Sequence, residues 1–429
     1  MGAAGAHAAL SAGRWVWAQR LGVCAAVCVS LLSCGGGGGG TLSSSSSASS
    51  GSGSGTTTTS ASNVASVVAD SGPVNNTVNT LYTSVTVCVP GSTTNCQTID
   101  NIQVDTGSVG LRILASALTL TLPVQPAAVG NSLVECTVFA DGYSWGPVAL
   151  VDMQIAGESA SNLPVQLIGD SRFPTIPADC SASPGTEQDT VSAFGANGIL
   201  GIGVFKQDCG SDCSNTVEPA AYYGCSSTQC VGTMVPLADQ VQNPVTLFAT
   251  DNNGTIIDLP TVAEEGAATL TGSLIFGIDT QSNNASGTET VLTVDPNSGY
   301  LTASFNGEAA ALSQSFIDSG SNGIYFTDSD IPECTDTNYS GFYCPATSLA
   351  LTVTLTGLNS VSSTVDFTVD NAETLGTDNP TFTVFPTLAG TNPVAQSFDF
   401  GLPFYFGRRV ATALENDTTS AGTGPYVAF

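Results

Sequence analysis

Two short motifs in this sequence combine residue types that could carry acid–base chemistry. Val104–Ser108 reads Val-Asp-Thr-Gly-Ser and Ile317–Ser321 reads Ile-Asp-Ser-Gly-Ser, so each half of the chain carries one copy. A glycine lets the backbone turn tightly under a carboxylate, and the hydroxyl groups can donate hydrogen bonds that hold the carboxylate oxygens in one plane. A single copy would be a plain turn. Two copies in similar apolar settings instead predict a pair of cooperating carboxyl groups.

The predicted pair is Asp105 and Asp318. Two carboxyl groups held about 3 Å apart cannot both ionise, so they share one proton and their pKa values separate. The charged member can then activate a water molecule while the protonated member polarises a carbonyl group. This chemistry uses neither a metal nor a cofactor, and we expect none.

The composition excludes most other kinds of hydrolytic site. The only histidine, His7, lies in a predicted signal peptide, so the mature chain would contain no histidine. This excludes Ser-His-Asp and Cys-His nucleophilic sites and the H-E-x-x-H zinc site. Lys206 is the only lysine and no G-x-x-x-x-G-K-[ST] motif occurs. A Schiff base and a phosphate-binding loop are therefore not expected.

The charge balance narrows the range of partners. Seven Lys and Arg residues face 35 Asp and Glu residues, which gives a net charge of −28. Such a surface repels phosphate backbones, so we expect no binding to nucleic acid. Only 10% of the residues are charged and 42% are hydrophobic, so the chain can bury a large core and is not an acidic disordered segment.

The N-terminus has the pattern of a bacterial lipoprotein signal, which we assign to residues 1–34. Arg14 and Arg20 precede the apolar run Leu21–Leu32, which is too short to span a membrane and is followed by Ser33 and Cys34. This pattern resembles a lipobox, in which the cysteine is acylated and becomes the new N-terminus. The alternative is an ordinary secretory signal.

Acyl chains on Cys34 would anchor the protein to a membrane surface. Gly35, rather than aspartate, follows this cysteine, which by resemblance to Gram-negative lipoproteins favours the outer membrane, on its periplasmic or its outer face. Residues 35–75 begin with a glycine run and a Ser/Thr/Gly tract, and we expect them to form a flexible tether.

Ten cysteines remain after residue 34, and an even number in an exported protein predicts disulfides. Close spacing suggests four pairs and leaves a fifth by exclusion. A zinc site is not expected, because the chain has no C-x-x-C pair and no histidine beyond the signal. The suggested pairs are Cys88–Cys96, Cys209–Cys213, Cys225–Cys230, Cys334–Cys344 and Cys136–Cys180.

From residue 76 onward the pattern is β throughout. Residues 80–89, 148–155, 270–278 and 349–355 read as strands, and turn-forming residues separate them. Few segments show a helical period, and Val235–Val241 is one short candidate. About 350 residues is long for one sandwich but suits two β lobes with a cleft between them. We therefore predict an all-β chain with lobes at 76–240 and 241–429.

These landmarks, in this order, resemble a pepsin-like aspartic peptidase over most of residues 76–429, and they imply its bilobal architecture. The chain as a whole also resembles an uncharacterised family of bacterial lipoproteins. The segments that carry the first resemblance are the two aspartate motifs, Phe139–Gly146 (flap hairpin), Asn197–Gly201 (glycine strand beside the first aspartate), Asn243–Phe248 and Gly272–Gly277 (second-lobe opening) and Phe400–Arg409 (closing glycine strand).

The resemblance implies a role for each residue around the aspartates. Thr106 and Ser319 would lock the two turns together. Ser108 and Ser321 would hydrogen-bond the outer carboxylate oxygens. The supporting residues are Thr106, Gly107, Ser108, Ser319, Gly320 and Ser321.

The predicted flap departs from the pattern of the family. Phe139 takes the position of the flap tyrosine, and Arg112 replaces the tryptophan that partners it. Tyr143 or Trp145 could substitute for that tyrosine. The alternative is that Phe139 and Tyr143 simply pack the hairpin. Arg112 could pair with a carboxylate near the cleft.

Two functions follow from these features. The first is a lipid-anchored endopeptidase, acting as a monomer on a polypeptide bound in the cleft between the lobes. The second is a surface lipoprotein that keeps the fold for binding or structure without activity. Residues 35–75 contain no Lys or Arg, so a basic activation peptide that would cover the aspartates is not expected.

Overall fold

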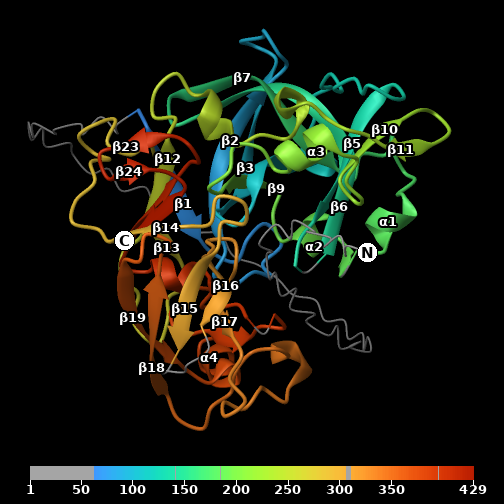
Figure 1. The fold of residues 1–429 in the computed structure, drawn as a ribbon. Coiled ribbons are helices and arrows are strands. Elements are labelled where there is room, and N and C mark those ends of the chain that lie inside the picture. The colour runs from blue at the N-terminus through green and yellow to red at the C-terminus, as the bar shows by residue number, and fades with distance from the viewer. Residues whose placement is uncertain (1–61, 141, 184, 306–310, 395) are drawn as a thin grey trace, which may run out of the picture.

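The computed structural model describes residues 62–140, 142–183, 185–305, 311–394 and 396–429. This part of the chain is predominantly β, which confirms the predicted fold class (Figure 1). The predicted signal peptide, the lipidation site Cys34 and most of the predicted tether lie outside the described residues. No helix within the described ranges is long and apolar enough to cross a membrane.

One sheet of sixteen strands contains strands from both halves of the chain. Its order is β11-β10-β5-β6-β7-β4-β9-β3-β2-β1-β13-β12-β22-β25-β14, with β8 beside β6. The strands are β1 (Val64–Ala69), β2 (Leu81–Cys88), β3 (Cys96–Asp105), β4 (Val109–Leu114), β5 (Ser132–Val138), β6 (Gly142–Ile155), β7 (Glu158–Ile168), β8 (Thr186–Glu187), β9 (Gly198–Ile202), β10 (Tyr222–Cys225), β11 (Cys230–Gly232), β12 (Gly254–Asp258), β13 (Leu270–Phe276), β14 (Val291–Thr293), β22 (Arg409–Ala413) and β25 (Tyr426–Ala428).

A second sheet of seven strands comes entirely from the C-terminal half, in the order β19-β18-β15-β16-β21-β17-β20. In Figure 1 its strands lie below β1, β12 and β13, while β5, β6 and β7 lie above. Its members are β15 (Leu301–Phe305), β16 (Leu312–Ile317), β17 (Ile324–Phe326), β18 (Leu349–Thr356), β19 (Ser362–Val369), β20 (Ala389–Thr391) and β21 (Asp399–Phe400), and β23 (Thr418–Thr419) pairs separately with β24 (Gly422–Thr423).

The helices are short and lie in the connections between strands. The segment predicted as helical, Val235–Val241, contains only a single 3-10 turn, η2. The helices are α1 (Ala178–Ser181), α2 (Val191–Phe194), α3 (Ser211–Asn215) and α4 (Ala372–Asp378), and the 3-10 turns are η1 (Ala115–Ala117), η2 (Leu237–Asp239), η3 (Pro244–Leu247), η4 (Thr337–Tyr339) and η5 (Leu402–Tyr405).

The fold begins earlier than the boundary predicted at residue 76. Strand β1 lies inside the segment assigned to the tether, and its side chains Ala65, Val67 and Ala69 are buried. It pairs with β2 on one side and with β13 of the C-terminal half on the other. The sequence Val-Ala-Ser-Val-Val-Ala has the alternating pattern of a half-buried strand. It was not recognised as a strand because it directly follows a Ser/Thr-rich run. The tether prediction 35–75 is therefore wrong from β1 onward.

Each aspartate motif belongs to the same three-strand unit. In the first unit β9 runs parallel to β3 and antiparallel to β4, with Asp105 opposite Gly201. In the second, β21 runs parallel to β16 and antiparallel to β17. Each motif thus connects two strands that enclose a third strand, and the two loops are built in the same way.

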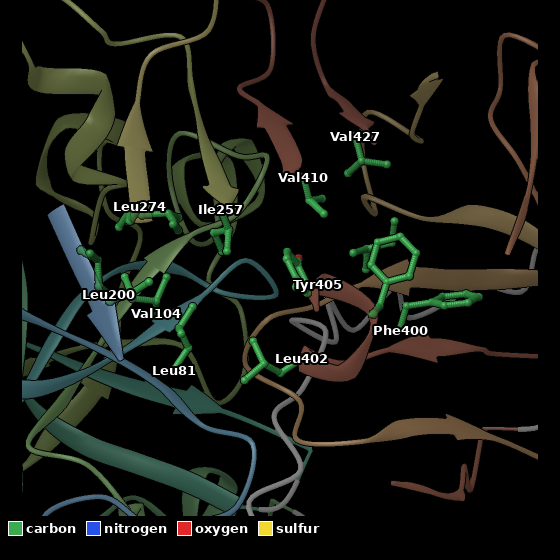
Figure 2. Close-up of a cluster of buried hydrophobic side chains, with 14 of the residues drawn as sticks. Leu81, Val104, Leu200, Ile257, Leu274, Phe400, Leu402, Tyr405, Val410 and Val427 are labelled. Atoms are coloured by element: carbon green, nitrogen blue, oxygen red, sulfur yellow. The ribbon is translucent and has the colours of Figure 1, made fainter. Parts of the chain in front are cut away.

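One apolar core extends behind both loops (Figure 2). It includes Val104 and Ile317, the residues that directly precede the two aspartates. Full burial of an aliphatic or aromatic side chain stabilises a fold by about 1.5–3 kcal/mol. The apolar residue at the start of each motif therefore anchors its loop. Figure 2 labels Leu81, Val104, Leu200, Ile257, Leu274, Phe400, Leu402, Tyr405, Val410 and Val427.

The ten late cysteines form the five disulfides that spacing and exclusion predict. Four bridges close short loops, and Cys136–Cys180 closes a separation of 44 residues between β5 and α1. The bridges are Cys88–Cys96, Cys136–Cys180, Cys209–Cys213, Cys225–Cys230 and Cys334–Cys344.

Candidate active site

The two aspartate motifs lie in different sheets, each at the end of a strand. Asp105 is the last residue of β3, and the next three residues lead into β4. Asp318 directly follows β16, and the chain continues into β17. The exposed fraction is 1% for Asp105 and 0% for Asp318. A carboxyl group buried this deeply needs hydrogen-bond partners.

The first loop supplies a donor for each oxygen of Asp105. The N–H of Gly107 donates to Oδ1 at 2.8 Å, and the hydroxyl of Ser108 donates to Oδ2 at 2.6 Å. A hydroxyl–carboxyl distance this short is typical of a charge-assisted hydrogen bond. Ser108 thus makes the contact with the outer oxygen that the resemblance implies.

The second loop repeats this pattern with one difference. The N–H of Gly320 donates to Oδ1 of Asp318 at 2.7 Å. The hydroxyl of Ser321 lies 3.1 Å from Oδ2 of Asp318, but it also lies 2.6 Å from Oδ2 of Asp399 on β21. The serine of the second loop is therefore shared between two carboxyl groups.

Reciprocal hydrogen bonds connect the two loops. The N–H of Thr106 donates to Oγ of Ser319 at 3.1 Å, and the N–H of Ser319 donates to Oγ1 of Thr106 at 3.0 Å. The Ser319 hydroxyl then donates to the carbonyl of Val104 at 3.0 Å. The Thr106 hydroxyl donates to the carbonyl of Ile317 at 3.4 Å. These four buried bonds fix the position of one loop relative to the other.

The two loops approach so closely that the glycine of each motif is required. A Cβ at Gly107 would lie 2.5 Å from Cγ of Asp318, and a Cβ at Gly320 would lie 2.5 Å from Oδ1 of Asp105. Any side chain at either position would displace the carboxyl group of the opposite loop. The same Cβ at Gly320 would lie 3.0 Å from Oδ1 of Asp318, so the two Oδ1 atoms lie beside each other at this glycine. The structure thus brings the two aspartates together.

The electrostatic environment favours the protonated form of Asp318. Burial raises the pKa of Asp318 well above its usual range, and the neighbouring Asp105 and Asp399 add to the rise. The N–H of Gly320 opposes the rise without cancelling it. Because a raised pKa favours the protonated form of Asp318 beside a second carboxyl group, the pair can offer an acid and a base at the same place.

Comparison with known proteins assigns the chain to a family. A family model described as "Protein of unknown function (DUF3443)" matches residues 59–429, which include both aspartate motifs. The chain belongs to the DUF3443 family. This confirms the expected membership of an uncharacterised family. No curated protein matches the chain. No relative supports the resemblance of this DUF3443 protein to pepsin-like peptidases, so that resemblance rests on its own residues.

The three predicted flap residues of the DUF3443 protein are packed into its N-terminal half. Phe139 is buried and contacts Phe194 of α2 edge-on, with ring centroids 6.1 Å apart. Tyr143 and Trp145 belong to a cluster around the Cys136–Cys180 disulfide. The indole N–H of Trp145 donates to the carbonyl of Phe173 at 2.9 Å. Among the described residues, the hydrogen bonds and ring contacts of these side chains do not reach the aspartate loops.

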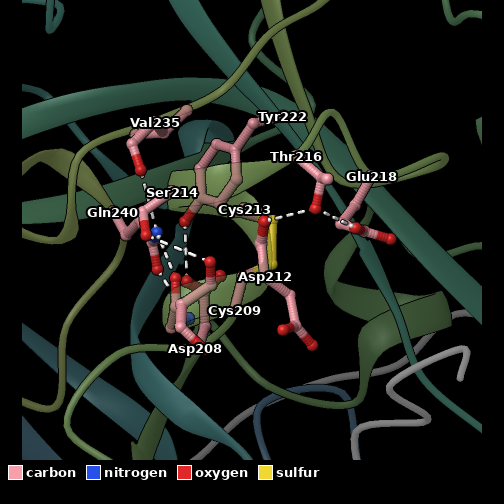
Figure 3. Close-up of a disulfide and its surroundings, with 12 residues drawn as sticks. Asp208, Cys209, Asp212, Cys213, Ser214, Thr216, Glu218, Tyr222, Val235 and Gln240 are labelled. Atoms are coloured by element: carbon pink, nitrogen blue, oxygen red, sulfur yellow. Dashed lines mark hydrogen bonds between the residues drawn. A yellow bond between two sulfur atoms is a disulfide. The ribbon is translucent and has the colours of Figure 1, made fainter.

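Arg112 lies on β4, two residues before the strand ends at Leu114, and forms a buried ion-pair network. Its Nη2 lies 2.6 Å from Oε1 of Glu135 on β5 and 3.0 Å from Oδ2 of Asp208. Tyr222 donates to the other oxygen of Asp208 at 2.7 Å, and Figure 3 shows this contact beside the Cys209–Cys213 disulfide. Arg112 therefore connects the strand after the first aspartate to β5, the strand that leads into the predicted flap hairpin.

The guanidinium group of Arg112 forms ion pairs with two carboxyl groups in this network. Burial lowers the pKa of Arg112, but the charges of Glu135 and Asp208 outweigh it and leave that pKa raised. Burial raises the pKa of Asp208 well above its usual range, with Glu135 adding to the rise and Arg112 opposing it. Oε2 of Glu135 is buried and has no hydrogen-bond partner among the described residues.

Four residues beside the aspartate pair or in the Arg112 network were not predicted from the sequence. They are Asp399, Tyr405, Glu135 and Asp208. The hydroxyl of Tyr405 lies 2.8 Å from Oγ1 of Thr106 and so supports the link between the loops. The signal available for Asp399 was an aspartate between two phenylalanines in an otherwise apolar strand.

The part of the chain that the structure describes offers little support for a metal-binding site. The one group of three possible ligands there is Cys334, Cys344 and Glu373. Its two cysteines form a disulfide, and a metal ligand must be a thiolate.

Proposed function

We propose that this DUF3443 protein is an aspartic-type endopeptidase that hydrolyses peptide bonds at Asp105 and Asp318. The proposal rests on the reciprocal hydrogen bonds between Thr106 and Ser319, which place two buried carboxyl groups side by side. Two like-charged groups in contact cost free energy. Two ordinary turns would gain nothing from placing their carboxyl groups together, whereas proton exchange with a substrate requires such a pair.

We also propose that the two three-strand units belong to the two lobes of a pepsin-like architecture that divide near residue 240, with the fold beginning at β1 instead of at the predicted residue 76. The matching pairs of strands around β9 and β21 support this. A polypeptide substrate would lie between the lobes, across the aspartate pair, and a monomer would suffice because one chain supplies both motifs.

The proposed mechanism uses the different surroundings of the two carboxyl groups. Asp105 accepts two hydrogen bonds within its loop and acts as the base that takes a proton from water. Asp318 acts as the acid and donates its proton to the carbonyl oxygen of the scissile bond. The resulting tetrahedral intermediate collapses when the proton held by Asp105 passes to the leaving amine and one hydroxyl group of the intermediate returns a proton to Asp318, which restores the starting state of the pair. No covalent enzyme intermediate forms.

The pH dependence of hydrolysis tests this proposal. The raised pKa of Asp318 means that its proton is present at low pH and is lost as the pH rises through that pKa, so the rate should fall on that side. The rate should fall again at very low pH, when both carboxyl groups are protonated. The full-length protein is incubated with an unstructured polypeptide from pH 2 to 9, and the products are quantified by mass spectrometry. Hydrolysis only above neutral pH would refute the proposal.

The second candidate function is a binding or structural protein without activity. The packing of Phe139 against Phe194 favours it, because the residue aligned with the flap tyrosine is held in the core and lacks a phenol group. Failure of the wild-type protein to cleave any of several unstructured substrates at acid pH, with the fold intact, would favour this second function.

We further propose that acylated Cys34 anchors the protein to the bacterial outer membrane. The lipobox pattern in the sequence supports this location. The Cys34→Ala variant is expected to leave the membrane fraction or to remain unprocessed, because it has no thiol to acylate. Fractionation followed by mass spectrometry of the N-terminus measures this. Mature, membrane-bound protein from the variant would overturn the assignment.

A further inference from the structure

The two aspartate units differ at one position beside the active pair. In the first unit, Ile199 of β9 lies opposite Gln103 of β3. At the matching position of the second unit, Asp399 of β21 lies opposite Phe316 of β16. Ile199 is a core residue, and Asp399 is a carboxyl group with an exposed fraction of 0%. Asp399 thus places a carboxyl group where the other unit has an aliphatic side chain.

Asp399 reaches the active pair through Ser321. The Ser321 hydroxyl lies 2.6 Å from Oδ2 of Asp399 and 3.1 Å from Oδ2 of Asp318. A hydroxyl group has one hydrogen, so it can be donated to only one of these carboxyl groups at a time. The shorter distance lies in the range of a hydroxyl–carboxylate bond, and the longer one does not. In the first loop, by contrast, Ser108 donates to Asp105 at 2.6 Å.

The surroundings of Asp399 offer few other partners. Its Oδ1 is buried without a hydrogen-bond partner, and none of the ion pairs among the described residues involves Asp399. The titratable groups that face it are Asp318 and Asp105 from the two loops, Tyr405 from η5, and Tyr325, its cross-strand neighbour on β17. Ser321 is therefore its main hydrogen-bond donor.

We propose that Asp399 is a positioning residue that competes with Asp318 for the single hydroxyl hydrogen of Ser321 and so keeps the proton of the active pair on Asp318. This inference rests on the proposed function and assigns the acid within it. With the hydrogen directed to Asp399, Asp318 lacks the serine donor that Asp105 has, and its ionised form is less stable. Burial, followed by the charge of Asp105, raises the pKa of Asp399, and the Ser321 hydroxyl opposes that rise.

The Asp399→Asn variant tests this proposal with little change in volume. The amide can donate to Ser321, so the hydroxyl hydrogen of Ser321 turns to Asp318 and stabilises its ionised form. We expect the titration midpoint of Asp318 to fall by about 1 pH unit. The upper limb of the pH–rate profile should move down by the same amount. Asp399→Leu, which resembles the aliphatic residue of the first unit, should act in the same direction.

The readout is ¹³C NMR titration of the Asp318 carboxyl in the full-length protein, assigned by its loss in Asp318→Asn. Asp366→Asn is the matched control, because Asp366 is an exposed carboxyl of the same sheet, on β19, and should leave the midpoint unchanged. An unchanged midpoint in both folded Asp399 variants would overturn the proposal. The titration needs no activity. An inactive wild-type protein would therefore refute the proposed function, while the midpoint would still decide the role of Asp399.

Discussion

Replacing Arg112 by methionine is expected to lower the free energy of unfolding by about 3–5 kcal/mol, because it leaves buried carboxyl groups without their cation. Arg112 is 1% exposed and is the cation that contacts both Glu135 and Asp208 in the described chain. Methionine fills much of the same volume, so the lost free energy of unfolding reflects mainly the removal of the positive charge. Denaturant unfolding followed by circular dichroism measures the effect.

The loss should depend on pH in a defined direction. Without the guanidinium group, the pKa values of the remaining carboxyl groups in the folded state should rise. A folded-state pKa above the unfolded value gives stability that is present at low pH and is lost as the pH rises. The destabilisation by Arg112→Met should therefore be greatest near neutral pH and smaller in acid.

Arg172→Met provides the matched control. Arg172 pairs with Asp170 at 2.6 Å, but its side chain is 48% exposed. An exposed pair contributes about 0–1 kcal/mol, because water and salt screen it. An equal loss in the two variants would contradict the view that burial makes the Arg112 network important for stability.

The features that the sequence predicted are those that depend on neighbouring residues. A strand such as β2 shows its alternation within eight residues, and cysteines as close as Cys225 and Cys230 have an obvious partner. Each aspartate loop likewise places its own glycine and serine around its carboxyl group. Local chemistry of this kind can be inferred without coordinates.

The features that the sequence did not predict depend on contacts between distant segments. Asp208 lies 96 residues from Arg112, and Asp399 lies 78 residues from Ser321. No periodicity connects such positions, and a charged residue in an apolar strand gives no indication of its partner. The start of the fold at β1 was missed for a similar reason, because its strand partner β13 lies in the other half of the chain.

Changing either aspartate of the pair to asparagine is expected to abolish hydrolysis. Each substitution removes one of the two groups that exchange protons with water and substrate, and general acid–base catalysis of this kind contributes about 10²–10⁴-fold. The fold should survive, because an amide has the shape of a carboxyl group and can still accept the bond from the loop N–H. The folded state of both variants is checked by circular dichroism and thermal unfolding.

Asp366→Asn serves as the control for the chemical change itself. Asp366 is exposed and accepts a hydrogen bond from Thr352 at 2.7 Å on the outer strands of the second sheet. The same carboxyl-to-amide change there should leave the rate of hydrolysis unchanged. A comparable loss of rate in this variant would show that the assay responds to general damage rather than to the aspartate pair.

The most direct test of the central claim is the rate at which equal amounts of full-length wild-type protein and its Asp318→Asn variant cleave one unstructured polypeptide at acid pH. We predict cleavage by the wild-type protein and none by the folded variant. Equal cleavage by the two proteins, or an intact substrate after incubation with the wild type, would contradict the claim that Asp105 and Asp318 form the catalytic pair.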